Sequence, residues 1–227
     1  MTKTTTAHKR TLVPSAIWQR TAVRHLKRVD PVLKSIIERV GPSRFVSAPK
    51  GSHLDALVRS IVSQQLSTSA AATIHGRLIA LVGKQQPLPE DWLALNDPDM
   101  RTAGLSRQKI AYIRDLARHV HERLIPMAKL HLMSDDDVIA ALTEVKGIGV
   151  WTAQMFLMFR LNRPDILPVL DLGIRNAFRR AYKLRKQPTE KRMVGIAKPW
   201  APYRSVASWY LWQSLELPIA ELEKSGG

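Results

Sequence analysis

The stretch "EVKGIGVWTAQ", residues 144–154, places two glycines one residue apart directly before a predicted helix. Glycine adopts positive φ without a Cβ clash, so Gly147 and Gly149 predict a tight turn that Ile148 can anchor by pointing inward. Backbone N–H groups at the start of the second helix would then point outward, where they can bind a phosphate oxygen. A Gly-x-Gly alone fits a core turn equally well. The surrounding "V-x-G-I-G-x-x-T-A" favours a phosphate-binding helical hairpin.

Helical signals recur along the whole chain, whereas alternating strand patterns are hard to find. Most apolar stretches at helical spacing follow a residue that accepts hydrogen bonds well at a helix N-terminus. We expect such N-caps at Ser15, Asp30, Ser52, Ser67, Asp97, Ser106 and Ser134. Further helices are predicted from Gly149, from Asp171, from Thr189 and from about Tyr203. The sequence therefore predicts an all-α protein of about ten short helices.

The net charge of +16, from 35 Lys and Arg against 19 Asp and Glu, indicates a polyanionic partner, most often nucleic acid. A basic housekeeping enzyme is the alternative that charge alone leaves open. The chain has no cysteine, which excludes disulfides, iron–sulfur clusters and thiolate zinc sites. We expect no cofactor and no metal held by side chains. Because no run of ~18 apolar residues exists, we expect no membrane partner and a cytoplasmic location.

Two proline-containing stretches interrupt the helical pattern and predict domain boundaries. One is "RLNRPDILPVLD", residues 160–171, and the other is "GPSRFVSAPKGS", residues 41–52. We expect one lobe from residues 13–52 with 164–227, and a central lobe from residues 53–163 that carries the hairpin at 142–160. Residues 1–12 are expected to form a flexible basic arm.

The segment "LPVLDLGIRNAF", residues 167–178, puts Asp171 at or just before the first turn of a helix. The ordinary explanation is an N-cap. Its position favours a second role, because Asp171 follows the second helix of the hairpin and a short loop, and can face the same phosphate. A helix N-terminus also favours the ionised carboxylate, which suits a group that stabilises positive charge.

The stretch "IVSQQLSTSAAATI", residues 61–74, ends one helix at Gln64, Gln65 and Leu66, just before the Ser67 cap. Two adjacent amides at a helix junction can enter a DNA minor groove or fill a gap left in a base stack. Without further context, a polar loop is the simpler explanation.

The tail "KPWAPYRSVASWYLWQSL" gathers aromatic rings on one predicted helix, with Trp209 and Trp212 three residues apart and Tyr203 before them. Core packing is the usual explanation of such a stripe. A flat, electron-rich wall for a cationic base is the more specific one.

Taken in this order, the motifs resemble those of the helix-hairpin-helix base-excision DNA glycosylases, most closely the 3-methyladenine DNA glycosylase II branch. The resemblance covers roughly residues 50–215. It implies a fold of two α-helical lobes with a DNA-binding cleft between them. The implied activity is flipping out alkylated purines, such as 3-methyladenine and 7-methylguanine, and hydrolysing their N-glycosidic bond in base excision repair.

The resemblance also implies roles for individual residues. Asp171 matches the catalytic aspartate in "LPVxDLG". The stretch "KGIGVWTA" matches the phosphate-binding hairpin, and Gln65 matches the wedge that fills the hole left by the extruded nucleotide. The implied base-pocket residues are Trp151, Trp212 and Tyr203, and the implied DNA-binding residues are Gln65, Ser67, Gly147, Ile148, Gly149 and Thr152.

Trp151 stands where members that also cut the DNA strand carry a lysine, which forms a Schiff base with the sugar. A tryptophan cannot form one, so the resemblance implies a monofunctional hydrolase without lyase activity. The expected partners are duplex DNA with alkylated bases and the abasic-site product, bound by a monomer; the location would be nuclear in a eukaryote. Two rivals stay open: a non-catalytic helix-hairpin-helix DNA-binding module, and a helical RNA-binding protein.

Overall fold

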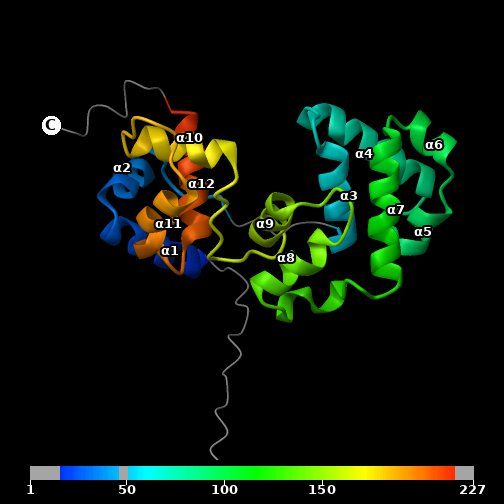
Figure 1. Cartoon of the computed structure of the whole chain (residues 1–227), viewed down its shortest axis with the longest axis horizontal. Coiled ribbons are helices and arrows are strands. Elements are labelled where there is room, and N and C mark those ends of the chain that lie inside the picture. Colours follow the sequence, from blue (N-terminus) through cyan, green and yellow to red (C-terminus); the bar gives the residue numbers. More distant parts are fainter. Residues whose placement is uncertain (1–15, 46–50, 218–227) are drawn as a thin grey trace, which may run out of the picture.

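The computed structural model describes residues 16–45 and 51–217, and within them the chain forms only helices, turns and loops (Figure 1). The predicted all-α class is therefore confirmed. None of the described helices is long and apolar enough to cross a membrane. The arm predicted over residues 1–12 and the N-cap predicted at Ser15 lie outside the described residues.

The helices follow one another as α1 (Ala16–Val29), α2 (Pro31–Val40), α3 (His53–Ser63), α4 (Thr68–Val82), α5 (Pro89–Ala94), α6 (Asp97–Thr102), α7 (Arg107–His121), η1 (Met127–Leu132), α8 (Asp135–Thr143), α9 (Val150–Phe159), α10 (Leu172–Ala181), α11 (Glu190–Ala197), η2 (Lys198–Trp200) and α12 (Arg204–Leu215). The two elements marked η are short 3-10 helices.

The main helix-to-helix contacts form two sets. In one set, which we call the terminal group, α1, α2 and α10 pack around α12, and α11 joins them through η2. In the other, the central group, α3 packs on α4, α7 and α9, while α5 and α6 pack on α7 and α8 packs on α9. Figure 1 shows the terminal group at left and the central group at right, with α9 between. The boundaries of two independent lobes stay a prediction.

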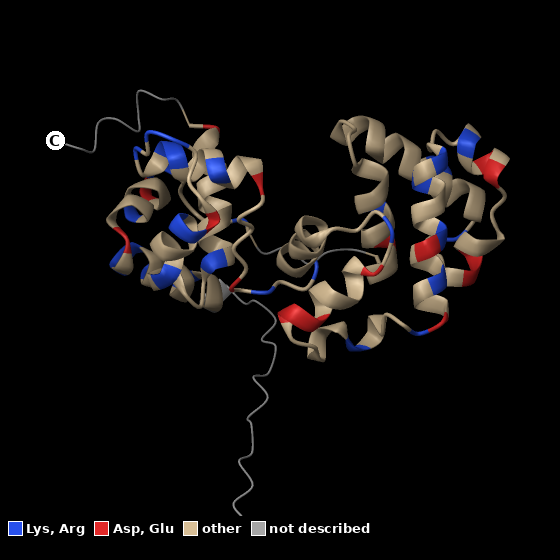
Figure 2. Cartoon of the chain, in the orientation of Figure 1, with Lys and Arg blue, Asp and Glu red and all other residues tan. Residues whose placement is uncertain are grey.

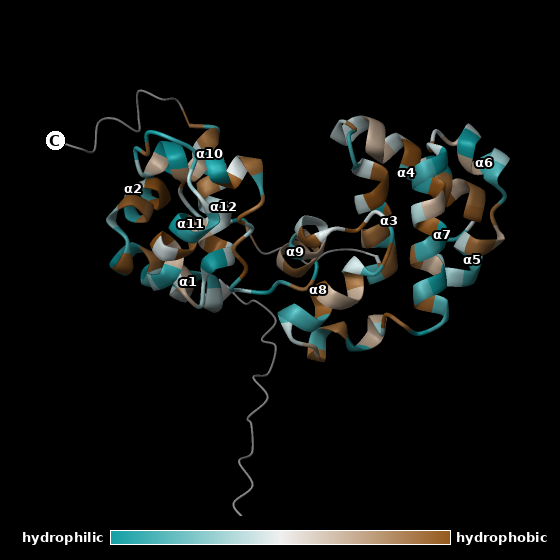
Figure 3. Cartoon of the chain, in the orientation of Figure 1, coloured by the Kyte–Doolittle hydropathy of each residue, from teal (hydrophilic) through white to brown (hydrophobic). Residues whose placement is uncertain are grey.

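Each group buries apolar side chains between amphipathic helices, which carry both brown and teal segments in Figure 3. In the terminal group, Phe178, Trp200 and Tyr210 are fully buried, and the Phe178 and Trp200 rings stack with centroids 5.3 Å apart. In the central group, Trp92 and Leu57 are fully buried. The helices α10 and α9 are thus each packed against a buried apolar core, which fixes the position of residues at their first turns.

Of the N-caps predicted within the described residues, five are confirmed and one is wrong. Asp30, Ser52, Ser67, Ser106 and Ser134 all cap as expected. For α6 the cap is Asn96, whose side chain accepts from Asp99 N, and not Asp97. Asp97 lies in the first turn with Pro98. Asparagine and aspartate cap equally well, so the side chain with the right backbone conformation decides.

Candidate active site

Three helices of the structure meet at one carboxylate, that of Asp171. Asp171 is the N-cap of α10, and its Oδ1 accepts from Ile174 N at 2.7 Å and from the Trp212 indole Nε1 at 2.9 Å. Its Oδ2 accepts from the Trp151 indole Nε1 at 2.8 Å. The structure therefore brings together three sequence-predicted site residues that come from α9, the start of α10 and α12.

The loop before α10 holds Asp171 in place through its contacts with α12. The Ser205 hydroxyl accepts from Ile166 N at 2.9 Å, and Ser205 N donates to Pro164 O at 2.9 Å. A turn then closes when Asp171 N donates to Pro168 O at 3.0 Å. Because Pro168 is buried and its φ is fixed, this turn fixes the backbone position of Asp171.

Gly173 makes room for this arrangement. A Cβ at Gly173 would lie 3.0 Å from Asp171 Oδ1 and 3.1 Å from Trp212 Nε1, tighter than ordinary van der Waals contact. Its glycine thus lets the indole approach the carboxylate closely. The glycine of "DLG" therefore has a packing reason that the sequence pattern alone did not give.

The carboxylate is held firmly and yet is open on one side. Each carboxylate oxygen accepts about two hydrogen bonds. Oδ1 already accepts two, whereas Oδ2 accepts one, from Trp151. Asp171 and Trp212 are half-buried and 43% of Trp151 is exposed. The site can therefore present an oriented negative charge, and one acceptor position on Oδ2, to a ligand lying against an indole.

The hairpin glycines differ from each other. Gly147 has φ +84, and a Cβ there would overlap the Tyr112 ring. Ile148 is buried, as predicted. Gly149 has φ −95, which any residue adopts, so the expectation of positive φ is wrong there. Gly149 is the N-cap of α9 and supplies no side chain, and a Cβ there would meet nothing within 4 Å. The first turn of α9 is thus open to an approaching ligand.

A set of contacts from α7 and the α3–α4 junction fixes the hairpin, and the sequence motifs did not predict it. Asp115 Oδ2 accepts from Lys146 N at 2.9 Å, and Gln64 Nε2 donates to Gly147 O at 2.8 Å. Lys109 Nζ donates to the carbonyls of Val62 and Gln64, both at 2.7 Å. Spacing along α7 carried a usable signal, because Lys109, Tyr112 and Asp115 are three apart and share one helix face.

Burial also affects two charged groups in this set. It lowers the pKa of Lys109. Burial opposes ionisation of Asp115, but hydrogen bonds from Lys146 N and from Arg118 outweigh it and lower the pKa of the carboxyl. The carboxylate that accepts from the turn is therefore kept charged at neutral pH.

The α3–α4 junction separates its two glutamines. Gln64 points to the hairpin, as described above, while Gln65 is exposed and has φ +58, in the left-handed region. The Ser67 hydroxyl caps α4 by accepting from Ala70 N at 3.3 Å. The predicted wedge residue thus stands at the tip of a turn whose base is tied to the hairpin.

Tyr203 does not join the Asp171 cluster. It is the N-cap of α12, and its ring packs edge-on against Trp18 at 5.8 Å and against His25 at 5.3 Å. Trp212 lies nine positions further along α12, which is about 13 Å along the helix axis. Its predicted place in the base pocket has no contact in support.

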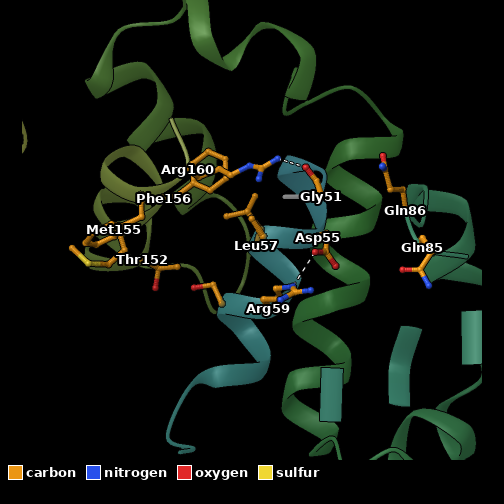
Figure 4. A pocket seen from close by; sticks show the side chains of 13 residues that line it. Gly51, Asp55, Leu57, Arg59, Gln85, Gln86, Thr152, Met155, Phe156 and Arg160 are labelled. Carbon is orange, nitrogen blue, oxygen red and sulfur yellow. Dashed lines mark hydrogen bonds and ion pairs between the residues drawn. The ribbon is translucent and has the colours of Figure 1, made fainter. Parts of the chain in front are cut away.

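Thr152 is buried in the first turn of α9 and lines a pocket of about 670 Å³ between α9 and α3. Figure 4 shows Thr152, Met155 and Phe156 on one side and Arg59 on the other. Phe159 also lines the pocket, and its ring lies 5.9 Å from that of Trp212. The pocket therefore adjoins the aromatic wall of the Asp171 cluster, although Asp171 itself is not among its lining residues.

Among the described residues, no group of three or more His, Asp or Glu side chains could hold a metal ion. The site itself presents a fixed carboxylate and two indoles, near the start of a helix that follows a glycine turn.

The chain thus combines an all-helical fold, a Gly-x-Gly hairpin and an aspartate at a helix start that accepts from two indoles. The profile of the HhH-GPD superfamily base excision DNA repair protein matches residues 58–202, and the chain belongs to this family. It is 36% identical over 198 residues to DNA-3-methyladenine glycosylase 1 of Schizosaccharomyces pombe. The alignment covers 85% of this chain and 86% of that protein.

Two solved structures are similar to this fold over most of the chain. A DNA-3-methyladenine glycosidase from Bacillus halodurans superimposes with a TM-score of 0.78 and 38% identity, over 85% of this chain and 88% of that one. A 3-methyladenine DNA glycosylase from Schizosaccharomyces pombe, in complex with abasic DNA, gives a TM-score of 0.76 and 33% identity, over 88% and 98% of the two chains. The helix-hairpin-helix glycosylase fold predicted from the sequence is confirmed.

Proposed function

We propose that this protein is a monofunctional DNA glycosylase that flips alkylated purines, such as 3-methyladenine and 7-methylguanine, out of duplex DNA and hydrolyses their N-glycosidic bond. The observation that carries the proposal is the Asp171 carboxylate, held by two indole N–H groups with one acceptor position open on Oδ2. The similar proteins named as DNA-3-methyladenine glycosylases support it.

Asp171 supplies the charge that the reaction needs. An alkylated purine is already cationic, so the bond between C1′ and the base nitrogen breaks with its electron pair going to the base, which leaves neutral. The sugar becomes an oxocarbenium ion, and the negative charge of Asp171 stabilises it. Water then adds to C1′ and its proton passes through Oδ2 to solvent. The three donors on the carboxylate orient it before the substrate arrives.

Trp151 and Trp212 form the wall of the base pocket in this proposal. Their rings are electron-rich, and cation–π attraction of ~0.5–2 kcal/mol favours a cationic base over a neutral one. Because alkylated purines also leave more readily, selectivity need not depend on hydrogen bonds to the base edge.

The hairpin and the α3–α4 junction grip the DNA. The open N–H groups at the start of α9, next to Gly147, Ile148 and Gly149, bind a phosphate of the damaged strand without reading sequence, and Thr152 supports that turn. Gln65 fills the space that the extruded nucleotide leaves, which offsets part of the few kcal/mol that extrusion costs. Ser67 lies beside Gln65 and contacts the minor groove.

Trp151 also limits the reaction to base removal. A lyase needs an amine that attacks C1′ and forms a Schiff base, whereas the indole nitrogen of Trp151 donates to Asp171 and has no nucleophilic lone pair. The product is therefore an abasic site in an intact strand. The protein binds this product as a monomer.

One assay tests the proposal. The protein is incubated with duplex DNA carrying 3-methyladenine or 7-methylguanine, and released base is measured by chromatography alongside strand cleavage and borohydride trapping. We expect free base, an intact strand and no trapped complex. Binding to abasic DNA without base release would assign the chain to the non-catalytic DNA-binding modules, and a trapped complex would contradict monofunctionality.

A further inference from the structure

Positive charge is distributed unevenly between the two groups of helices. In the terminal group, residues 16–40 and 172–217 hold 16 Lys and Arg against 4 Asp and Glu, a net charge of +12. Residues 51–163 hold 13 against 11, a net charge of +2. The hairpin and the α3–α4 junction, which are the DNA contacts of the proposed function, lie in the nearly neutral part. Most of the charge therefore has no role in those contacts.

The densest part of this charge begins beside the candidate active site. From Leu172 to Thr189 there are six Lys and Arg and no acidic residue. Figure 2 shows blue segments on α10 and on the loop that follows it. We define the α10 strip by its members that do not brace the fold: Arg175, Arg179, Lys183, Arg185 and Lys186.

The strip residues are available to a ligand. Arg175 is half-buried and the other four are exposed. Within the described part of the chain none of the five forms an ion pair, and the Nε of Arg175 has no hydrogen-bond acceptor. The neighbouring Arg180 differs, because its guanidinium donates to the carbonyls of Leu215 and Leu217 at the end of α12.

The geometry of α10 leads the strip away from Asp171. Residues four apart share one helix face, so Arg175 and Arg179 lie one above the other. With a rise of 1.5 Å per residue they lie about 6 and about 12 Å along the axis from Asp171. One strand of a duplex carries a phosphate every ~3.4 Å of axis. Arg179 thus lies farther from Asp171 than the ~10 Å that three flanking base pairs span, so a contact with the far part of the strip needs a longer duplex.

We infer that the α10 strip is a second DNA-binding surface, which holds the duplex backbone that flanks the lesion. This inference rests on the proposed function, because the sugar must lie at Asp171 for the flank to reach the strip. The contacts are to phosphates, so they fix the position of the duplex and carry no sequence information. They add affinity that depends on duplex length and falls steeply with salt.

The test compares two variants that each lose three exposed cations from the terminal group. The first combines Arg179→Gln, Lys183→Gln and Lys186→Gln in the strip. The control combines Arg20→Gln, Arg24→Gln and Lys34→Gln, which lie on α1 and α2. Both carry the same net charge. Binding is measured on hairpin-closed duplexes of about 7 and about 21 base pairs with a central abasic analogue, over a range of salt concentrations.

On the long duplex we expect the strip variant to bind at least about tenfold more weakly, with the slope of log affinity against log salt smaller by about 2 to 3. On the short duplex we expect the strip variant to bind almost as tightly as wild type. The control variant should bind both duplexes as tightly as wild type. Equal losses in the control, or on the short duplex, would show an effect of net charge alone and overturn the proposal. Unchanged binding to the long duplex would also overturn it, and weaker binding of the same variant to anionic vesicles would then assign the strip to a lipid surface.

Base release by the wild-type protein, measured in parallel, separates this inference from the proposed function. A length-dependent loss in the strip variant, from a protein that releases no alkylated base, would support the strip and refute the glycosylase. Equal circular dichroism and melting of the variants excludes misfolding as the cause.

Discussion

Asp30 and Asp171 show how one local structure serves two ends. Each aspartate caps a helix of the terminal group, and each accepts from a tryptophan indole N–H. Asp30 Oδ1 accepts from Val32 N and Leu33 N, while Oδ2 accepts from the Tyr182 hydroxyl at 2.7 Å and from Trp200 Nε1 at 2.8 Å. All four acceptor positions of Asp30 are thus filled, whereas Asp171 keeps one open.

Burial separates the two carboxylates further. Asp30 is 6% exposed and Trp200 is fully buried. Burial, together with the Asp30 charge and hydrogen bond, raises the pKa of Tyr182 well above its ordinary range, so the phenol stays protonated and donates. At Asp171 the partner Trp151 is 43% exposed. The same residue types therefore stabilise the fold in the sealed place and can meet a substrate in the open one.

The largest expected effect is on stability at the sealed site. Asp30→Ala leaves two backbone N–H groups, the Tyr182 hydroxyl and the Trp200 indole without their acceptor in the core, so we expect a loss of about 3–5 kcal/mol in the free energy of unfolding. Urea denaturation measures it. The matched Asp171→Ala should lose only about 1–2 kcal/mol, because the site is half-buried and water can reach the donors that lose their acceptor. Equal losses would remove the distinction.

The next effect concerns activity at the open site. Asp171→Asn keeps a good N-cap but removes the charge that stabilises the oxocarbenium ion, so single-turnover release of 3-methyladenine should fall by about 10²–10³-fold. Affinity for abasic DNA should change little. Asp30→Asn serves as the control and should release base at the wild-type rate per folded molecule. If Asp171→Asn released 3-methyladenine at a near-normal rate, the assignment of Asp171 as the catalytic residue would be wrong.

The hairpin glycines divide in the same way and give a smaller effect. Gly147→Ala forces a Cβ into the Tyr112 ring at φ +84, so we expect a loss of about 1–3 kcal/mol in stability. Gly149→Ala has φ −95 and open space, so we expect a loss below about 1 kcal/mol, from the preference of an N-cap for glycine over alanine. Its methyl group would instead stand where a phosphate approaches the start of α9. Thermal melting and DNA titration of both variants check this. If neither variant binds DNA more weakly than wild type, the proposed phosphate contact at the hairpin is contradicted.

Local chemistry explains which features the sequence could predict. A cap depends on one side chain and the next three residues, so Asp30, Ser52 and Asp171 were predictable as caps, and the Asn96 error is a one-residue ambiguity between equivalent caps. The candidacy of Asp171, Trp151 and Trp212 followed from the resemblance of their motifs to those of the glycosylase family. The indole hydrogen bonds did not, because Trp151 and Trp212 are far apart in sequence and meet only through packing.

Tertiary contacts explain the rest of the difference. Gly147 needs to be glycine because Tyr112 of α7 lies against it, and nothing near the hairpin in sequence reveals that neighbour. The brace from Lys109 to the α3–α4 junction likewise joins residues 45 or more positions apart. Tyr203 shared a sequence stripe with Trp212, yet a helix of three turns carries it to Trp18 instead.

The smallest expected effect isolates one hydrogen bond at each carboxylate. Trp151→Phe keeps an aromatic wall but removes the N–H that orients Oδ2, so release of 3-methyladenine should fall about 3- to 10-fold, near the value of one hydrogen bond, with stability within about 0.5 kcal/mol of wild type. Trp200→Phe removes the equivalent bond in the core and should cost about 1–3 kcal/mol of stability without slowing release per folded molecule. If both variants lost stability alike and neither slowed release, the open carboxylate would be another structural cap, and the reaction would need a different residue.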